Sequence, residues 1–266
     1  MPKIQINGIE INYEDRGSGE ETIVFSHGLL WSTALFDNQV NYLQGKFRCI
    51  SFDFRGQGKS EITYDGYDMD TLAVDAAELI KKLKLGPCHF VGLSMGGFIG
   101  LRLGIGEPDL IKSLILLDTT AHCEPAKSAR KYRLLNFIAR WFGLSLVADQ
   151  AMAVMFGRKF LNDKQRSGLK REMKTKLLSN DRTGITRAIR GVIERDGIYD
   201  EIGSITAPTL ILVGDGDVAT PIKQSEKMHD KIKGSELKII PGAGHSSPVE
   251  EPEFVNAAIE KYLSKI

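Results

Sequence analysis

Ser94 is the central residue of the sequence GLSMG, which spans residues 92–96 and has a glycine at each end. An apolar run precedes this sequence and an apolar helical pattern follows it, so we expect a sharp turn from a strand into a helix. Only small residues permit the close backbone approach that such a turn requires. The turn would project the Ser94 hydroxyl at a helix N-terminus, where backbone N–H groups stabilise a developing negative charge. The spacing therefore predicts a nucleophilic serine.

A serine hydroxyl needs a general base at neutral pH, and the chain has five histidines. His245, in the loop sequence PGAGHSSP, follows the last predicted strand, at the sheet edge where the sites of open α/β sheets form. We predict that His245 is the base, with His122 as the reserve candidate. We expect the others to have structural or solvent-exposed roles: His27 shapes a loop, His89 belongs to the core, and His229 lies on a polar helix.

A carboxylate must orient the imidazole of the base, and three aspartates follow predicted strands. Asp217, in the sequence GDGDVATP, is our first choice because it lies further into its loop than Asp215 and nearer the next helix. Asp215 and Asp118, the last residue of LILLD, remain alternatives. The chain order Ser94, Asp217, His245 is the order that accompanies this serine motif.

The oxyanion of an acyl-transfer reaction needs two hydrogen-bond donors. We predict that these are the backbone N–H of Met95, directly after the nucleophile, and the backbone N–H of Leu29, in the loop after TIVFSHG. Only backbone atoms are required, so the side-chain types at these positions carry little information. This chemistry needs no cofactor and no metal, and we expect neither.

Strand-like and helix-like segments alternate around these residues. The sequence KIQINGIEINYEDRG predicts a hairpin with a tight turn at Asn7 and Gly8. From Thr22 to Asp118, short strands that are apolar throughout alternate with helices, which is typical of a parallel sheet covered on both faces. One of these helices has the sequence DTLAVDAAELIKKLKL, and we expect Gly86 to end it.

The alternation stops from about Ala121 to Ile205, where the pattern is helical and basic, and it then resumes. We predict an α/β fold with a mostly parallel, doubly wound sheet, an N-terminal antiparallel hairpin and an inserted helical lid. The core domain would comprise residues 1–120 and 206–266, and the lid residues 121–205. Six apolar side chains either line an acyl pocket or pack the lid on the core: Trp31, Trp141, Phe142, Met152, Met155 and Phe156.

The composition of the 266 residues, 42% hydrophobic and 26% charged, is that of a globular protein. A net charge of +1 argues against a dedicated nucleic-acid binder. The charge is uneven, because residues 121–200 contain 17 Lys and Arg against 8 Asp and Glu, and the remainder contains 18 against 26. This basic segment either steers an anionic substrate to the site or solvates the outer faces of amphipathic helices.

No apolar run is long enough to span a membrane, so we expect no membrane partner. The N-terminal sequence lacks the pattern of a signal peptide. Of the three cysteines, Cys49 and Cys88 lie in apolar runs typical of strands, so we expect their thiols to be buried. The odd number of cysteines and the lack of a CxxC pair favour reduced thiols and a cytoplasmic location. The oligomeric state is not predicted.

The chain resembles proteins of the α/β-hydrolase fold over nearly its whole length, and among them small esterases and enol-lactone hydrolases. The resemblance implies a Ser94–Asp217–His245 triad, an oxyanion hole at Leu29 and Met95, and a helical lid. In that family DFRGQGKS is a structural turn and not a phosphate loop. The matching sequences are SHGLL (26–30), DFRGQGKS (53–60), GLSMGG (92–97), GDGDVATP (214–221) and GAGH (242–245).

These residues predict a serine hydrolase that cleaves a small-molecule carboxylic ester or lactone through an acyl-enzyme. Ser94 sets the chain apart from family members that use an aspartate nucleophile on carbon–halogen bonds or epoxides. Leu30 stands where the related haloperoxidases have the proline of HGxP, which counts against a perhydrolase. A perhydrolase, a carbon–carbon bond hydrolase, an amide hydrolase and a ligand-binding signalling protein on the same fold remain alternatives.

Overall fold

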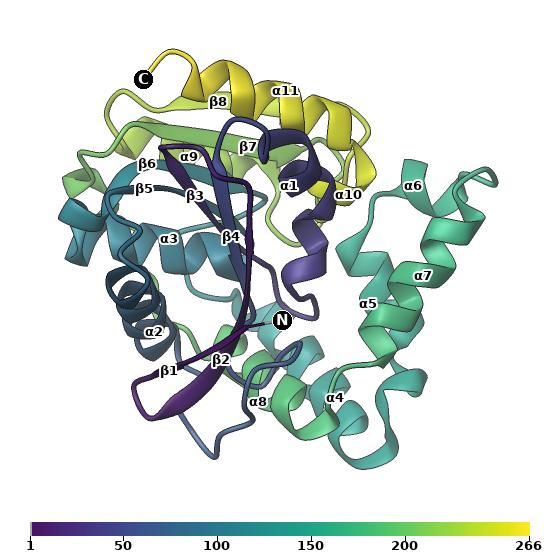
Figure 1. Cartoon of the computed structure of the whole chain (residues 1–266). Coiled ribbons are helices and arrows are strands. Elements are labelled where there is room, and N and C mark those ends of the chain that lie inside the picture. The colour runs from purple at the N-terminus through teal and green to yellow at the C-terminus, as the bar shows by residue number, and fades with distance from the viewer. Residues whose placement is uncertain (1) are drawn as a thin grey trace.

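The computed structural model describes residues 2–266, in which the strands form one sheet (Figure 1). The strand order is β1-β2-β4-β3-β5-β6-β7-β8. β1 and β2 pair antiparallel, β2 and β4 pair antiparallel, and every later pair is parallel. The predicted fold class is confirmed. The strands are β1 Lys3–Ile6, β2 Ile9–Arg16, β3 Thr22–Ser26, β4 Arg48–Phe52, β5 Cys88–Leu93, β6 Ile111–Leu117, β7 Thr209–Gly214 and β8 Glu236–Ile240.

The N-terminal hairpin has the tight turn that its sequence predicts. Ile6 of β1 lies opposite Ile9 of β2, which leaves only Asn7 and Gly8 in the turn. Both turn residues have positive φ, 46° and 79°, and asparagine and glycine adopt this conformation most readily. The hairpin thus sets the register of the antiparallel edge of the sheet.

Helices cover both faces of the sheet, which explains why its strands are apolar throughout. In β3, Ile23 and Phe25 pack in the cluster that contains residues of α1 and α11, whereas Val24 packs in the cluster that contains residues of α2, α3 and α9 (Figure 1). Successive residues of a strand point to opposite faces, so a strand covered twice buries every side chain. These helices are α1 Asp37–Leu43, α2 Met69–Lys82, α3 Met95–Gly106, α9 Ile222–Lys231 and α11 Pro252–Leu263, with the short α10 Ser247–Glu250 before α11.

The helix α2 begins where an aspartate caps it and ends earlier than predicted. The side chain of Asp68 accepts a hydrogen bond of 2.8 Å from the N–H of Thr71. At the other end, Lys84 has a φ of 55°, its N–H bonds to the carbonyl of Lys81, and the next N–H bonds to that of Ile80. This is the helix-ending pattern that glycine usually supplies, so the prediction that Gly86 ends the helix is wrong. A lysine takes the left-handed conformation instead.

The chain between β6 and β7 is helical, as its sequence pattern predicts, and residues 121–205 contain no strand. Figure 1 shows its helices as a group beside the sheet, with α6 and α7 farthest to the right. Whether this segment is a separate domain stays a prediction. The helices are α4 Ala126–Phe142, α5 Ala148–Met155, α6 Arg158–Asn162, α7 Ser167–Leu178 and α8 Arg182–Ile193, and the short 3₁₀ helices of the chain are η1 Thr33–Phe36, η2 Pro108–Leu110, η3 Leu144–Leu146 and η4 Ile202–Ser204.

The three cysteines are free thiols, and two of them are buried as predicted. Burial raises the pKa of Cys49 and of Cys88 to about 12, whereas Cys123 is exposed. Separately, no helix within residues 2–266 is both long enough and apolar enough to cross a bilayer.

Candidate active site

Ser94 lies at a strained turn between β5 and α3. Its φ is 51° and its ψ is −111°, a conformation that residues other than glycine rarely adopt. Its N–H donates to the carbonyl of Leu117 on the neighbouring strand β6 at 2.9 Å, which holds the turn against the sheet. A Cβ on Gly92 would lie 2.4 Å from the carbonyl oxygen of Gly96, and a Cβ on Gly96 would lie 2.0 Å from that of Ser26. Both positions therefore require glycine, because any side chain would clash with a backbone carbonyl.

The structure brings Ser94, His245 and Asp217 together in one buried chain of hydrogen bonds. His245 Nε2 lies 2.8 Å from Ser94 Oγ, and His245 Nδ1 lies 2.9 Å from Asp217 Oδ2. An ionised carboxylate can only accept hydrogen bonds, so the proton of the neutral imidazole resides on Nδ1. Nε2 is then free to accept the hydroxyl proton of Ser94.

The charges of this pair stabilise one another. Burial on its own lowers the pKa of His245, but the charge and hydrogen bond of Asp217, together with the charges of Asp118 and Glu250, outweigh burial, and the pKa is raised. Burial on its own raises the pKa of Asp217, but His245 and the hydrogen bonds from Thr220 outweigh it, and that pKa is lowered. The site thus favours an imidazolium next to a carboxylate, which is the state that follows proton transfer from a serine.

The alternative acids lie nearby but hold loops instead of the imidazole. Asp118 accepts hydrogen bonds from the N–H of Gly214 at 2.8 Å and from that of Ser247 at 3.4 Å. Burial, followed by the charge of Asp217, raises the pKa of Asp118 to about 7. Asp215 accepts from the N–H of Gly242 at 2.8 Å. These two carboxyls support the loops that carry Asp217 and His245, and neither hydrogen-bonds to a histidine within residues 2–266.

Three other histidines contact residues other than Ser94. His122 stacks on Tyr199 with ring centroids 4.5 Å apart. His89 is buried and contacts Ser113 Oγ at 2.8 Å, and His229 is exposed and contacts Ser235 Oγ at 2.9 Å. Nε2 of His122, the reserve base, has no hydrogen-bond partner within residues 2–266, and the imidazole that contacts Ser94 Oγ is that of His245.

Two backbone N–H groups near Ser94 have no protein acceptor within residues 2–266: those of Met95 and Leu29. Met95 is the first residue of α3, so its N–H has no partner inside the helix. Leu29 lies in the loop after β3, and its side chain lines the same cavity as Ser94. Both positions are those predicted for the oxyanion donors.

Comparison with known proteins gives the family. A family model described as the alpha/beta hydrolase fold matches residues 21–252. The chain belongs to the α/β-hydrolase-fold family. It is similar to 3-oxoadipate enol-lactonase 2 of Acinetobacter baylyi, with 26% identity over 97% of this chain and 94% of that protein. It is also similar to the AB hydrolase superfamily protein YisY of Bacillus subtilis, with 30% identity over 94% and 93%.

A solved structure agrees with this assignment over the whole chain. The thermophilic esterase of Thermogutta terrifontis has a TM-score of 0.92 and 29% identity, and the match covers 100% of this chain and 99% of that one. The resemblance to esterases and enol-lactone hydrolases is therefore confirmed. Such relatives support hydrolase activity for this α/β-hydrolase-fold protein.

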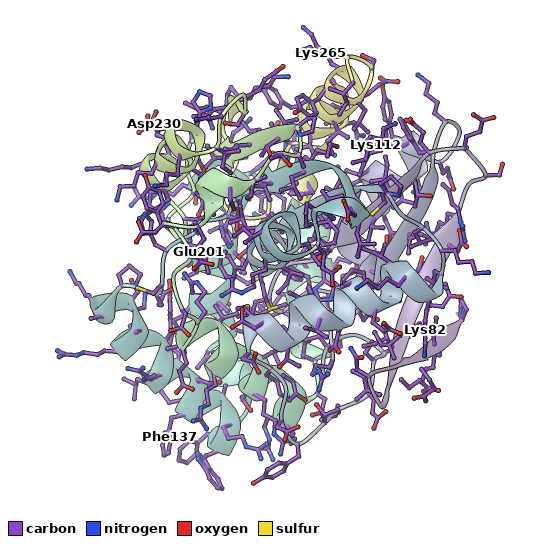
Figure 2. All side chains as sticks on the ribbon, turned by 90° about the vertical axis from the view of Figure 1, so that its left-hand side faces the viewer. Lys82, Lys112, Phe137, Glu201, Asp230 and Lys265 are labelled. Carbon is purple, nitrogen blue, oxygen red and sulfur yellow. The ribbon has the colours of Figure 1, made fainter. Side chains whose placement is uncertain are left out.

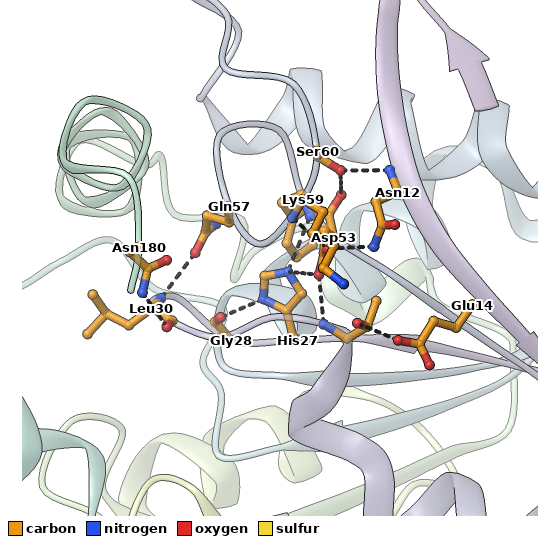
Figure 3. A network of polar contacts seen from close by, with 12 residues as sticks. Asn12, Glu14, His27, Gly28, Leu30, Asp53, Gln57, Lys59, Ser60 and Asn180 are labelled. Atoms are coloured by element: carbon orange, nitrogen blue, oxygen red, sulfur yellow. Dashed lines mark hydrogen bonds and ion pairs between the residues drawn. The ribbon is translucent and has the colours of Figure 1, made fainter. Parts of the chain in front are cut away.

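The loop of this α/β-hydrolase-fold protein that carries Leu29 is held by two side chains that sequence reasoning missed. Leu30 has a φ of 74°, and both its N–H and its carbonyl are hydrogen-bonded to side chains. Its N–H donates to Gln57 Oε1 at 3.1 Å, and its carbonyl accepts from Asn180 Nδ2 at 2.9 Å (Figure 3). Gln57 belongs to the sequence DFRGQGKS, which the resemblance identified as a structural turn. The motif did not indicate that the Gln57 side chain reaches the loop of Leu30.

Asp53, the first residue of DFRGQGKS, connects the same loop to the sheet. Its carboxylate accepts hydrogen bonds from the N–H of Thr33 at 2.7 Å, from Asn12 Nδ2 at 2.7 Å and from the N–H of Lys59 at 2.9 Å (Figure 3). His27 Nε2 lies 3.9 Å from Asp53 Oδ1. That contact is not an ion pair, because Nε2 accepts the N–H of Phe54 and burial lowers the pKa of His27.

A buried carboxyl joins the inserted helices to the loop of His245. Glu250 Oε2 accepts from the N–H of Gly157, between α5 and α6, at 2.8 Å, and its Oε1 accepts from the N–H of Ser246 at 3.1 Å. Burial raises the pKa of Glu250. No sequence pattern pointed to this residue, because its two partners lie on different elements.

A cavity of about 140 Å³ opens beside Ser94 and His245. Of the six apolar side chains considered from the sequence, only Met155 lines it. Trp31, Met152 and Phe156 are buried in the core, and Trp141 and Phe142 are 66% and 65% exposed. Met155 therefore fits the pocket alternative. Trp31, Met152 and Phe156 fit the packing alternative. Trp141 and Phe142 fit neither. The walls come mainly from one stripe of α4, together with α5 and α8: Tyr132, Leu135, Ala139, Ala151, Val154 and Ile189.

Removal of the Gln57 side-chain acceptor tests whether Gln57 holds the loop that carries Leu29 and Leu30. Gln57→Leu would leave the N–H of Leu30 unpaired and would shift the neighbouring N–H of Leu29. If Leu29 donates to the oxyanion as the sequence predicts, kcat for an ester substrate should fall roughly tenfold to a hundredfold and KM should change little, because loss of a whole oxyanion donor costs about 10²–10³. Gln44→Leu, on a contact remote from the loop, is the control. An increase in KM with kcat unchanged would contradict this role for Gln57.

Proposed function

We propose that the protein is a serine hydrolase that cleaves a carboxylic ester or lactone through an acyl-enzyme. The observation that carries the proposal is the continuous chain Ser94 Oγ–His245–Asp217, with contacts of 2.8 Å and 2.9 Å, at the end of a mostly apolar cavity. The side chains lie in the order that nucleophilic catalysis requires: nucleophile, base and the group that orients the base.

In this proposal Ser94 Oγ attacks the substrate carbonyl while His245 Nε2 takes its proton. Asp217 keeps the imidazole in the required tautomer and stabilises its cation. The backbone N–H groups of Leu29 and Met95 donate to the oxyanion of the tetrahedral intermediate. His245 then protonates the leaving alcohol, and a water that gives its proton to His245 releases the acid from Ser94.

We also propose that residues 121–205 act as a lid, since α4, α5 and α8 supply most of the cavity wall. The wall contains one cation, Arg195, and it is paired with Glu124 at 3.0 Å. A buried pair with no net charge gives an anionic substrate no unpaired cation. We therefore favour a neutral, apolar acyl group over the anionic substrate that the basic lid segment suggested.

A series of p-nitrophenyl esters of increasing acyl length tests this function. We expect turnover with an acyl-enzyme on Ser94, and a kcat/KM that rises about fourfold for each methylene that the cavity buries. Val154→Phe narrows the cavity at a half-buried wall position, so it should remove the gain for longer chains but not for acetate. Val74→Phe, at an exposed position of α2, is the matched control.

Two outcomes would contradict the proposal. A single slow turnover without acyl-enzyme release would favour a ligand-binding protein on this fold. A kcat/KM that is higher for a carboxylate-bearing ester than for its neutral analogue, and that falls with added salt, would restore the anionic substrate.

A further inference from the structure

The outer face of α4 carries a row of exposed apolar side chains. Leu134, Phe137, Trp141 and Phe142 are 61%, 55%, 66% and 65% exposed, and we call them the aromatic ridge. The ring of Phe137 lies 6.5 Å from that of Trp141 and 6.4 Å from that of Phe142, measured between centroids. Figure 2 shows Phe137 at the outer end of the molecule, pointing away from it. A contiguous exposed apolar patch of this kind marks a binding surface.

The aromatic ridge is not the face by which α4 packs on the protein. Tyr132, Leu135, Asn136 and Ala139 form the opposite stripe, and they line the cavity beside Ser94. Both stripes follow helical spacing, so α4 has an apolar face on each side. The inner one is covered, and the outer one faces solvent.

Four arginines flank the aromatic ridge in a shallow groove between α4 and α8. Arg133, Arg140, Arg187 and Arg190 line this groove, which we call the arginine groove, together with the rings of Phe137 and Trp141. Its single acid is Glu194, which pairs with Arg190 at 2.8 Å. The other three arginines are not paired with a carboxylate within residues 2–266. The groove therefore has an excess of positive charge next to exposed aromatic rings.

The distribution of charge along the chain also favours an anionic partner for this side of the protein. Residues 121–200 carry 17 Lys and Arg against 8 Asp and Glu, whereas the rest of the chain is net negative. The helix α4 has five Lys and Arg and no acid. Such an asymmetric charge orients a protein with its basic side toward a negative surface.

We propose that the aromatic ridge and the arginine groove dock this protein on the surface of an anionic lipid bilayer. The rings and Leu134 enter the interface between headgroups and acyl chains, and the guanidinium groups bind lipid phosphates. The expectation that the chain has no membrane partner depended on the lack of a spanning run, and peripheral docking needs no such run.

The charges and the apolar area together favour a bilayer over other occupants. A soluble phosphate compound would use the arginine groove but would leave the aromatic ridge in water. A second copy of this chain would cover the ridge but would bring two sets of unpaired arginines together, and like charges at an interface oppose association. Only a surface that is both apolar and anionic matches both features.

Asn136 and Ile193 line both the arginine groove and the cavity, so they separate the docking surface from the candidate active site. Docking would place the lid wall directly against the lipid. If the proposed function holds, a lipophilic ester dissolved in the bilayer would reach the cavity over a short path. The docking itself does not depend on hydrolysis.

Vesicle binding of the full chain tests the proposal without an activity readout. The probes are vesicles of phosphatidylcholine alone and of phosphatidylcholine with phosphatidylglycerol, and the readouts are co-sedimentation and tryptophan emission. The chain has two tryptophans, of which Trp31 is 3% and Trp141 is 66% exposed, so a blue shift on binding would arise from Trp141. We expect binding and a blue shift with the anionic vesicles only.

Variants of the two features should act separately. Phe137→Ser with Trp141→Ser should lower the partition coefficient for anionic vesicles at least tenfold. Arg133→Gln should lower it roughly fivefold, since each cation near an anionic surface contributes about that factor. Val74→Ser, exposed on α2, and Lys233→Gln are the matched controls and should bind as the wild type does. The thermal midpoint of each variant shows that it folds.

Three results would overturn the proposal. The first is equal binding to neutral and anionic vesicles, or binding to neither. The second is tight binding of soluble glycerophosphate or inositol phosphate that the Phe137 and Trp141 substitutions leave unchanged. The third is a dimer in sedimentation velocity that the same two substitutions convert to a monomer, which would assign the aromatic ridge to a second copy of the chain.

Discussion

Replacement of Ser94 by alanine is expected to lower kcat for an ester substrate by about five to six orders of magnitude, because the proposed mechanism would lose its nucleophile. Ser94 Oγ is the atom that lies 2.8 Å from His245 Nε2. Without this oxygen, no nucleophile at this position can attack the substrate carbonyl, and no acyl-enzyme can form. Intact-mass spectrometry after treatment with a fluorophosphonate should show one adduct on the wild type and none on Ser94→Ala.

The control for this variant is a second serine close to the same histidine. Ser246 directly follows His245, and its buried hydroxyl has no hydrogen-bond partner within residues 2–266. Ser246→Ala should therefore keep both the adduct and most of the activity, because loss of an unpaired hydroxyl costs little. A phosphonate adduct that persists unchanged in Ser94→Ala would show that another residue is the nucleophile.

The positions of Ser94, His245 and Asp217 could be predicted because each depends on a local pattern. Each residue follows a strand of the parallel part of the sheet, and the carboxyl ends of parallel strands meet at one edge. The GLSMG turn also requires a glycine on each side of Ser94, at residues 92 and 96, and this requirement can be recognised from five residues of sequence. Once the strands are recognised, residues 151 positions apart must therefore lie near one another.

The lining of the cavity could not be predicted for a different physical reason. Both stripes of α4 are apolar, one through Leu135 and Ala139 and the other through Phe137 and Trp141. Helical periodicity locates the stripes but does not say which of them faces the sheet. The two hydrogen bonds to the Leu30 backbone could not be predicted either. Gln57 and Asn180 are 27 and 150 residues away in the sequence, and no local pattern shows that their side chains point to Leu30.

Replacement of Asp217 by asparagine is expected to lower kcat about 10⁴-fold, because it would impose the wrong tautomer on His245. Asp217 Oδ1 accepts the N–H groups of Ala219 at 2.8 Å and Thr220 at 3.0 Å, so an asparagine would keep its oxygen on that side. Its amide nitrogen would then face His245 Nδ1 and donate to it. The imidazole proton would move to Nε2, which could no longer accept the proton of Ser94.

The same substitution at Asp118 separates the two candidate acids. Asp118 does not bond to His245, and an asparagine can still accept the N–H of Gly214, so we expect kcat of Asp118→Asn to stay within about tenfold of the wild type, as for groups outside the reacting unit. A loss as large as that of Asp217→Asn would instead make Asp118 the acid of the triad.

The pH profile gives the sign of the interaction between these groups. In the proposed mechanism His245 must be neutral to act as the base, so kcat/KM falls as the pH falls through the pKa of His245, which lies above its ordinary value of 6.5. Asp217, and more weakly Asp118, raise that pKa once burial has been overcome. Removal of the Asp118 charge should therefore move the acid limb of kcat/KM to lower pH. An acid limb that moves to higher pH in Asp118→Asn would contradict this electrostatic account of the base.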